Sequence, residues 1–377
     1  MDHDARMIDS KRIYREIAFV FLKLGVLAFG GPAAHIAMME EEVVQKRKWV
    51  TKEQFVDMLG FTNLIPGPNS TEMAIHLGFE RGGRIGLLLA GSCFILPAML
   101  LVLMFAILYQ QYGTIPAVSH VFDGIKPVIL AIVIQALIRL GRTILKRTDV
   151  IILFVAVLTA ALFHVSEIPL LIGAGVLMLL WRSWQSGRAA RLMVVEPVSL
   201  VVLFLIFLKI GSVLYGSGYV LLAFLKTEFV DTRGLLTAQQ LLDAVAVGQF
   251  TPGPVFTTAT FIGYLIHGLP GAILATVGIF LPSFLLVLLL HRLIEKIRSH
   301  PRVSQILDGV NAASLALMAS VSLQLAASTL TSVPLIAIFL ISAFLLIRFK
   351  INATWLLLGG GLAGYIIDWI RVTMAAL

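Results

Sequence analysis

Long continuous runs of apolar residues, separated by short polar connections, make up most of the chain. A membrane-spanning helix needs about 20 predominantly apolar residues, and continuous runs rather than alternating ones are typical of such helices. In the first half the runs lie at about residues 15–38, 85–109, 121–140, 150–164 and 168–182, and a similar series begins at about residue 197. The pattern predicts an all-α polytopic membrane protein with about ten spanning helices.

The chain is a tandem repeat. Phe21–Pro68 aligns without a gap with Phe207–Pro254, at an offset of 186 residues. The identical positions include charged and turn-forming residues, among them Lys23/Lys209, Glu42/Glu228, Arg47/Arg233, Asp57/Asp243 and two Pro-Gly-Pro triplets. Chance similarity between apolar segments would align leucines and isoleucines instead. We therefore divide the chain into a first repeat (12–185), a linker (186–200) and a second repeat (201–377).

The basic residues predict that the two repeats have opposite orientations. Arg139–Arg147 carries four basic residues and Gln110–His120 carries no Lys or Arg. In the second repeat the pattern reverses, because His291–Arg302 carries four basic residues and Ala326–Val333 carries none. By the positive-inside rule this indicates two homologous inverted-topology repeats, an arrangement typical of secondary transporters. Basic residues before the first span favour the other orientation, which leaves the side of the N-terminus open.

Composition narrows the class of protein further. Charged residues make up 13 % of the chain, against about 25 % in soluble domains, hydrophobic residues make up 59 %, and mean hydropathy is +0.95. The net charge of +8 comes from short clusters between apolar runs, so it indicates topology rather than nucleic-acid binding. The single cysteine, Cys93, excludes an intramolecular disulfide, and no Cys/His metal spacing is present. No phosphate-binding loop or Ser/His/Asp pattern occurs, so we expect no enzyme, metal or cofactor.

Each repeat contains a moderately apolar stretch that prolines interrupt. Pro66-Gly67-Pro68 breaks Phe55–Glu80, and Pro252-Gly253-Pro254 breaks Leu241–His267. Proline removes a backbone donor and stops a helix, and such a break is tolerated at membrane depth only where protein or water covers it. We predict two re-entrant or discontinuous segments, with a new half-helix starting near Pro68 and another near Pro254. The alternative is that the prolines only shape helix packing.

These breaks are the candidate binding site for an oxyanion. A half-helix N-terminus has free N–H groups and a positive dipole end, and inversion would bring the two breaks face to face. The candidate hydrogen-bond donors beside them are Asn69, Ser70, Thr71, Thr251, Thr257 and Thr258. Lys23 and Lys209 lie at matched positions within apolar runs, where they either attract a dianion or reach the membrane interface.

Four titratable residues are candidates for proton coupling: Glu72, Asp57, Asp243 and His76. Their structural alternatives are ion pairs or helix caps for the aspartates, and dipole stabilisation for Glu72 in a first helical turn. Glu42 with Arg47 has the pattern of a solvated loop ion pair.

The chain resembles the chromate ion transporter family in its long form with two homologous domains. The resemblance covers nearly the whole chain and rests on FLKLG…FGGPAAHIAMMEEE (Phe21–Glu42), LIPGPNSTEMA (Leu64–Ala74) and GQFTPGPVFTTATFIGY (Gly248–Tyr264). It implies a multi-pass transporter of the cell inner membrane that exports chromate from the cytoplasm and is associated with chromate resistance. We expect this export to be coupled to protons, by antiport. The family motif carries over to Gly30, Gly31, Pro32 and His35, to Pro66 through Glu72, and to Pro252, Gly253 and Pro254.

Two other classes of function stay open. One is a transporter of sulfate or another anion. The other is a passive anion channel, because half-helix N-termini also line pores. A membrane chromate reductase lacks a visible flavin, haem or metal site. The expected partners are chromate, with sulfate as the alternative, together with protons and the lipid bilayer. No nucleic acid is expected, and a homodimer is left open.

Overall fold

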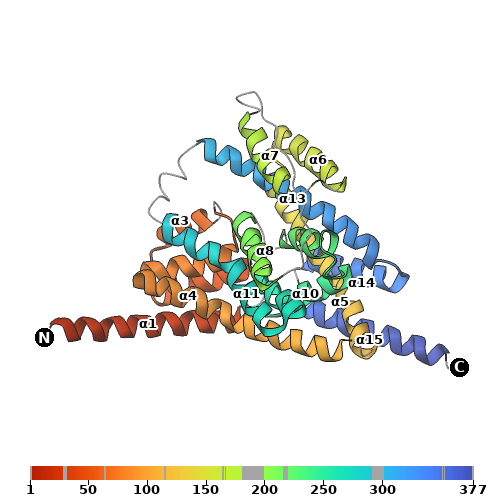
Figure 1. The fold of residues 1–377 in the computed structure, drawn as a ribbon, viewed down its shortest axis with the longest axis horizontal. Coiled ribbons are helices and arrows are strands. Elements are labelled where there is room, and N and C mark those ends of the chain that lie inside the picture. The colour runs from red at the N-terminus through yellow and green to blue at the C-terminus, as the bar shows by residue number, and fades with distance from the viewer. Residues whose placement is uncertain are drawn as a thin grey trace. The chain divides into compact units, whose positions relative to one another are not determined.

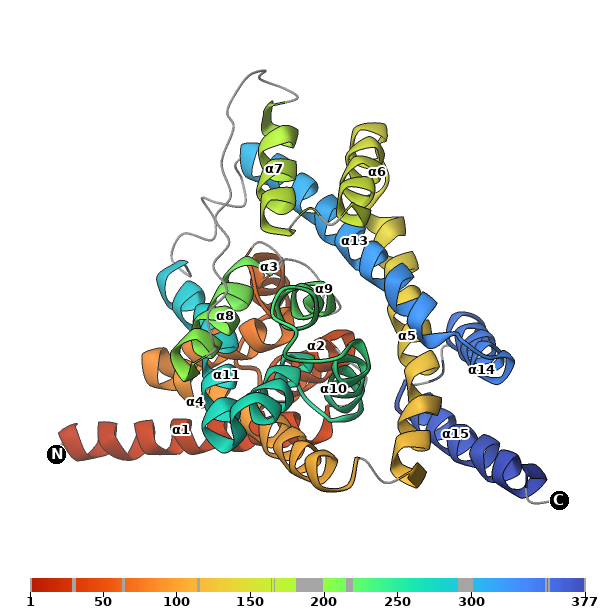
Figure 2. The ribbon, with the colours of Figure 1, turned by 45° about the vertical axis from the view of Figure 1, so that its right-hand side comes forward.

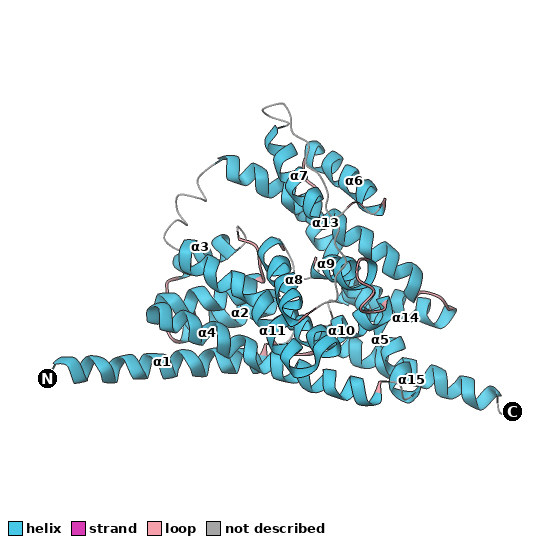
Figure 3. Ribbon diagram, in the orientation of Figure 1, coloured by secondary structure: helices cyan, strands magenta, loops and turns pink. Residues whose placement is uncertain are grey.

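The computed structural model describes residues 2–28, 32–62, 65–113, 116–163, 165, 167–180, 199–214, 220–290, 301–349, 351 and 353–375. Gly30, Gly31, nearly all of the predicted linker and most of the basic segment His291–Arg302 lie outside these residues. Helices make up most of the described part of the chain, which contains no strand (Figures 1 and 3). The all-α class is therefore confirmed.

The helices follow one another along the chain in matching order in the two repeats. From the first repeat come α1 (Asp2–Leu27), α2 (Pro32–Glu40), η1 (Glu41–Lys46), α3 (Lys52–Thr62), α4 (Asn69–Tyr112), α5 (Pro116–Ile144), α6 (Thr148–Leu162) and α7 (Glu167–Leu180). From the second come α8 (Leu200–Val213), α9 (Leu221–Leu225), η2 (Lys226–Asp231), α10 (Ala238–Phe250), η3 (Val255–Thr257), α11 (Thr258–Leu290), α13 (Pro301–Thr329), α14 (Val333–Phe344), η5 (Leu345–Phe349) and α15 (Ala353–Ala375).

The chain forms two compact units, and each takes segments from both repeats. Unit 1 comprises Met1–Leu108, Leu203–Gly218 and Val247–Arg298. Unit 2 comprises Tyr109–Val202, Tyr219–Ala246 and Ser299–Leu377. Both Pro-Gly-Pro breaks, although far apart in sequence, therefore belong to unit 1.

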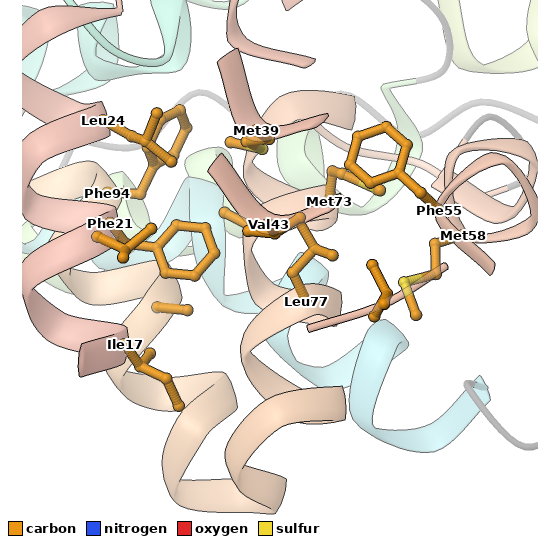
Figure 4. Close-up of a cluster of buried hydrophobic side chains, with 14 residues drawn as sticks. Ile17, Phe21, Leu24, Met39, Val43, Phe55, Met58, Met73, Leu77 and Phe94 are labelled. Atoms are coloured by element: carbon orange, nitrogen blue, oxygen red, sulfur yellow. The ribbon is translucent and has the colours of Figure 1, made fainter. Parts of the chain in front are cut away.

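A cluster of buried apolar side chains holds together the first-repeat part of unit 1 (Figure 4). It joins buried side chains from α1, α2, η1, α3, α4 and the connection before α3: Ile17, Val20, Phe21, Leu24, Met39, Val43, Val50, Phe55, Met58, Met73, Ala74, Leu77, Ala90 and Phe94. Burying one such side chain stabilises a fold by about 1.5–3 kcal/mol in water. In lipid the corresponding gain comes from close packing. This cluster packs the first turns of α4, which follow the first break, against α1, α2 and α3.

The chain reverses direction within α4 and again within α11. Gly82 and Gly83 leave the helical conformation with φ −139° and 60°, and His267 and Gly268 repeat this with φ −137° and 60°. On either side of the first reversal, a Cβ added at Gly78 would collide with the backbone of Gly86. Eight residues of straight helix would separate those positions by about 12 Å. Each half-helix that follows a break therefore folds back on the next helical segment.

The segments before the breaks also match in detail. Thr51 and Gln54 form a reciprocal capping box at the start of α3, with N···O distances of 2.9 and 3.2 Å. Thr237 and Gln240 do the same at the start of α10, at 2.9 and 3.1 Å. Such boxes satisfy backbone donors that a helix N-terminus leaves free. The repeat seen in the sequence is thus a repeat of local structure.

Unit 2 is built around α5 and α13, which pack against each other (Figure 2). Helices α6 and α7 pack on α13, and helices α14 and α15 pack on α5. Glycines permit the closest approach, since a Cβ at Gly124 of α5 would collide with the backbone of Gly360 in α15. Small residues at helix contacts are typical of membrane proteins.

Several helices are suited to a membrane. Among the described residues, four helices are long and apolar enough to cross one, and they fall into repeat-related pairs: Asn69–Tyr112 with Val255–Leu290, and His120–Ile144 with Asp308–Thr329. Shorter apolar helices lie at Thr148–Leu162, Pro169–Met178, Leu200–Val213, Val333–Phe349 and Ala353–Ile367. A membrane protein with several apolar helices is confirmed, whereas ten spans and two re-entrant segments stay predictions.

Candidate anion-binding site

Each Pro-Gly-Pro triplet separates two helical segments, as the sequence predicts. Helix α3 ends at Thr62 and α4 begins at Asn69, so the break falls on Pro66–Pro68. Helix α10 ends at Phe250, and η3 and α11 follow Pro254. All three residues of each triplet are buried, which satisfies the requirement that protein cover non-helical backbone at membrane depth.

The two breaks exchange equivalent hydrogen bonds with the opposite repeat. Gly67 donates its N–H to the carbonyl oxygen of Leu214 at 2.8 Å, just after α8. Gly253 donates its N–H to the carbonyl oxygen of Ala28 at 3.1 Å, just after α1. Gly253 and Leu214 are the repeat partners of Gly67 and Ala28, at the same 186-residue offset. The segments around the breaks are therefore related by an approximate twofold exchange within unit 1.

Glycine is required at the centre of the first break. Gly67 has φ 137°, a conformation that side-chain-bearing residues rarely adopt. A Cβ at this position would collide with Oε1 of Glu72 and Oγ of Ser283. The Glu72 carboxylate thus lies directly against the break. At the second break Gly253 has φ 91°, and its added Cβ would lie 2.8 Å from Cβ of Ala98, the repeat partner of Ser283.

Glu72 and its neighbour Thr71 are the least satisfied polar residues of this site. Both are 0 % exposed. Oε1 of Glu72 accepts a hydrogen bond from Ser283 Oγ at 3.2 Å. Glu72 Oε2 and Thr71 Oγ1 have no hydrogen-bond partner among the residues that the structure describes. Burying polar atoms without partners is costly, and native proteins seldom do so without a functional reason.

The other predicted donors already make local bonds. The hydroxyls of Thr251, Thr257 and Thr258 donate to the carbonyls of Gly248, Pro254 and Val255 at 3.3, 2.8 and 2.8 Å. In the first turn of α4, the N–H groups of Thr71 and Glu72 both donate to the carbonyl of Pro68. Ser70 is buried and Asn69 is half-buried. Thr71 is consequently the predicted donor whose hydroxyl is left without a partner in the described chain.

The matched lysines have different surroundings. Lys23 donates to Glu42 Oε1 at 2.6 Å, and its side chain is 38 % exposed. Lys209 is exposed. The interpretation of Glu42 as a solvated loop residue is wrong, because it is only 6 % exposed and also lies 3.4 Å from Arg47 Nε. The hydrogen bond from Lys23 lowers the pKa of Glu42 below its ordinary value.

The structure separates the four candidates for proton coupling. Glu72 lies at the first break, and His76, one turn further along α4, is buried with its ring 5.5 Å from that of Phe61. Asp57 is exposed on α3. Asp243 belongs to unit 2, where it is buried and bonded to Tyr109 and Lys126.

Sequence reasoning missed Ser283, the hydroxyl that bonds Glu72. A signal for it exists in the repeat alignment, because Ser283 follows Pro282 where Ala98 follows Pro97. The alignment thus pairs a polar residue in the second repeat with an alanine in the first. Helix packing alone does not require such a difference. His35, a motif residue, is buried and bonds the carbonyl of Ala28 at 2.9 Å. That carbonyl also accepts from Gly253, so His35 supports the second break.

The sequence profile of the chromate transporter family matches residues 15–180 and again residues 201–365. The chain belongs to the chromate transporter family. The two matches coincide with the two repeats, and members of this family are transport proteins rather than enzymes. Because the family profile matches once in each repeat, membership of the family explains why the helices and the Pro-Gly-Pro break occur in two copies.

Full-length relatives agree with this assignment. The chain is 30 % identical over 372 residues to a chromate transport protein of Cupriavidus metallidurans, with 93 % of this chain and 92 % of the relative covered. It is 31 % identical over 386 residues to a chromate transport protein of Pseudomonas aeruginosa, covering 94 % and 92 %. An uncharacterized transporter of Methanocaldococcus jannaschii is 27 % identical over 92 % of each chain. No solved structure is significantly similar.

Proposed function

We propose that the chain transports chromate across the cell inner membrane and that the anion binds at the two Pro-Gly-Pro breaks. The names of the full-length relatives support the substrate. The observation that carries the site is a pair of buried atoms at the start of α4, Thr71 Oγ1 and Glu72 Oε2, which have no hydrogen-bond partner among the described residues. Both atoms are sealed from solvent, so access requires a conformational change. Alternating access in secondary transporters is such a change.

The chemistry of the breaks fits a tetrahedral dianion such as chromate or sulfate. A dianion that enters the membrane loses its hydration and must regain donors and positive charge. The starts of α4 and α11 supply dipoles, each worth about 0.3–2 kcal/mol per unit charge. Hydroxyls of Thr71, Thr257 and Thr258 supply donors once the two threonines of the second break turn from the backbone. Helix dipoles alone are too weak to offset the hydration that a dianion loses. In this proposal Lys23 and Lys209 therefore contribute positive electrostatic potential.

Glu72 is the proposed proton-sensitive group. The described chain offers its carboxylate no cation, and an ionised Glu72 would repel a dianion bound at the same half-helix. Protonation removes the repulsion and turns the carboxyl into a donor. Anion binding and proton binding at this site therefore favour each other. This coupling supports symport, in which protons and the anion move in the same direction. From the sequence we expect antiport instead. The direction of proton flux relative to chromate flux distinguishes the two.

The test is uptake of radiolabelled chromate into proteoliposomes with imposed pH gradients and with sulfate as competitor. We expect a pH gradient to drive chromate above equilibrium and sulfate to compete. Chromate that only equilibrates, whatever the gradient, would indicate a passive channel. If sulfate moves and chromate does not, the substrate is wrong while the site proposal stands.

The inverted arrangement is a second part of the proposal, supported by the reversed basic loops and by the twofold exchange at the breaks. We expect single cysteines at Tyr112 and Ser299, in a Cys93→Ala background, to be labelled by an impermeant maleimide from opposite sides of the membrane. The reactivity of both from one side would contradict the inversion.

The role of Lys23 is tested against a neighbour in the same ion-pair cluster. We expect Lys23→Ala to weaken chromate binding by about tenfold, the effect of roughly 1.4 kcal/mol. Arg47→Ala removes another partner of Glu42 and should change affinity far less. Equilibrium binding to the purified variants is the measurement. Wild-type affinity in Lys23→Ala, and also in Lys209→Ala, would remove the lysines from the site.

A further inference from the structure

Unit 2 contains a cavity of about 560 Å³ that plays no part in the site at the breaks. Its volume lies within the range typical of small-ligand pockets, about 300–1,000 Å³. It is lined from α5, α10, α14, α15 and the end of α13. The polar residues of the lining are His120, Asp123, Lys126, Thr237, Gln239, Ser328, Thr329, Thr331 and Ser332.

A buried lysine forms one wall of this cavity. Lys126 is 6 % exposed, and its Nζ lies 2.9 Å from Asp123 Oδ1 and 3.5 Å from Asp243 Oδ1. Other groups complete the network. Tyr109 donates to Asp243 Oδ2 at 2.7 Å, Gln239 donates to Asp123 Oδ1 at 3.1 Å, and His120 Nδ1 lies 3.9 Å from Asp123 Oδ2. One ammonium is thus shared between two carboxylates.

Hydroxyl groups and a helix N-terminus also line the cavity. Ser328 and Thr329 end α13, and Thr331 and Ser332 precede α14. Ser332 is the N-cap of this 12-residue helix, yet its side chain makes no capping hydrogen bond. The first N–H groups of a helix and its positive dipole end favour an anion. The same cavity is therefore lined by Lys126 and by further anion-binding groups.

The second repeat shows that the fold does not need this lysine. The repeat partner of Lys126 is Asn311, which occupies the same position on α13. The partner of Asp123 is Asp308, which lies 3.6 Å from Arg147 and is 41 % exposed. The same helix position is therefore built without a buried cation in one repeat and with one in the other. This asymmetry favours a ligand-binding role for Lys126.

We propose that this cavity binds a tetrahedral dianion together with one proton. One lysine and two aspartates leave a net charge of −1, which repels a dianion. Protonation of Asp243 by a proton from water makes the three groups neutral and breaks the longer of the two ion pairs. Lys126 then donates to the anion while it keeps Asp123. The proposal deepens the proposed function and rests on it for the class of anion.

The test uses the full chain in detergent with Cys93→Ala and a reporter cysteine, Ser328→Cys, on the cavity wall. Sulfate is the probe, because chromate oxidises thiols, and a neutral maleimide reports the labelling rate. We expect sulfate to slow labelling, with half-protection at a concentration at least tenfold lower at pH 6 than at pH 8. Lys126→Gln should raise that concentration at least tenfold at pH 6, and Asp243→Asn should abolish the pH difference. The matched control Asp308→Asn should leave both values unchanged.

Each remaining outcome is decisive. No protection by sulfate at either pH, or a pH difference that survives in Asp243→Asn, would overturn the proposal. If Lys126→Gln is not monodisperse, Asp243→Asn carries the test alone. Chromate flux through wild-type vesicles is measured in parallel. Flux without sulfate protection overturns this inference only, and protection without flux overturns the proposed function only.

Discussion

Gly67→Ala is expected to reduce chromate transport at least tenfold while the protein still inserts in the membrane. The substitution places a Cβ against Glu72 Oε1 and Ser283 Oγ, and it imposes a side chain on a residue with φ 137°. A strained backbone conformation of this kind costs about 1–3 kcal/mol. The carboxylate must move to relieve the collision, so the site loses its geometry. Initial rates of chromate uptake into proteoliposomes are the measurement.

Gly83→Ala is the matched control for this prediction. Gly83 also has a positive φ, 60°, but a Cβ there meets no atom within 4 Å. The control therefore carries the conformational cost without the collision. Near-normal transport in Gly83→Ala beside loss in Gly67→Ala is the expected result. Equal transport in the two variants would show that the contact between Gly67 and Glu72 does not matter.

Glu72→Gln is expected to remove the response of transport to pH. Glutamine preserves the shape and the hydrogen bond with Ser283, yet it stays uncharged at every pH. Uphill chromate movement driven by a pH gradient should fall to background, while exchange of chromate down its own gradient continues. The physical reason is that the Glu72 carboxyl is buried and has no cation beside it in the described chain, so in this proposal it is the group that gains and loses the proton.

Glu80→Gln controls for the loss of one acid from the same helix. Glu80 lies two turns further along α4 and is exposed. We expect the pH profile of its transport to match that of the wild type, because Glu80 lies away from the break. An unchanged profile in Glu72→Gln would contradict the role of Glu72 and would direct attention to Asp243 or Asp57.

Local features of the fold were predictable from the sequence. The prolines of each triplet fix where α3 and α10 must end, and α4 starts at Asn69, directly after Pro68. The repeat was predictable because the lysine, aspartate and Pro-Gly-Pro positions recur at one offset. Proline geometry and sequence identity act over a few residues or by alignment, so no tertiary structure was needed.

The partners of the candidate residues were not predictable, because they come from distant parts of the chain. Ser283 meets Glu72 across 211 positions, and the carbonyl that accepts from Gly67 belongs to the other repeat. Lys23 and Glu42 were assigned separate roles, although they form one ion pair. Mixing of both repeats within each unit also has no local signature, since it depends on which helices pack together.

We propose that the transported anion binds at the breaks in unit 1. Crystals of the protein soaked with chromate, measured at the chromium absorption edge, test it most directly, because the anomalous signal locates chromium itself. We expect a chromium peak near Gly67, placed so that a chromate oxygen lies within hydrogen-bond distance of Thr71 Oγ1, and we expect it to disappear in Gly67→Ala. Chromium peaks that lie only elsewhere, in protein with full transport activity, would contradict it.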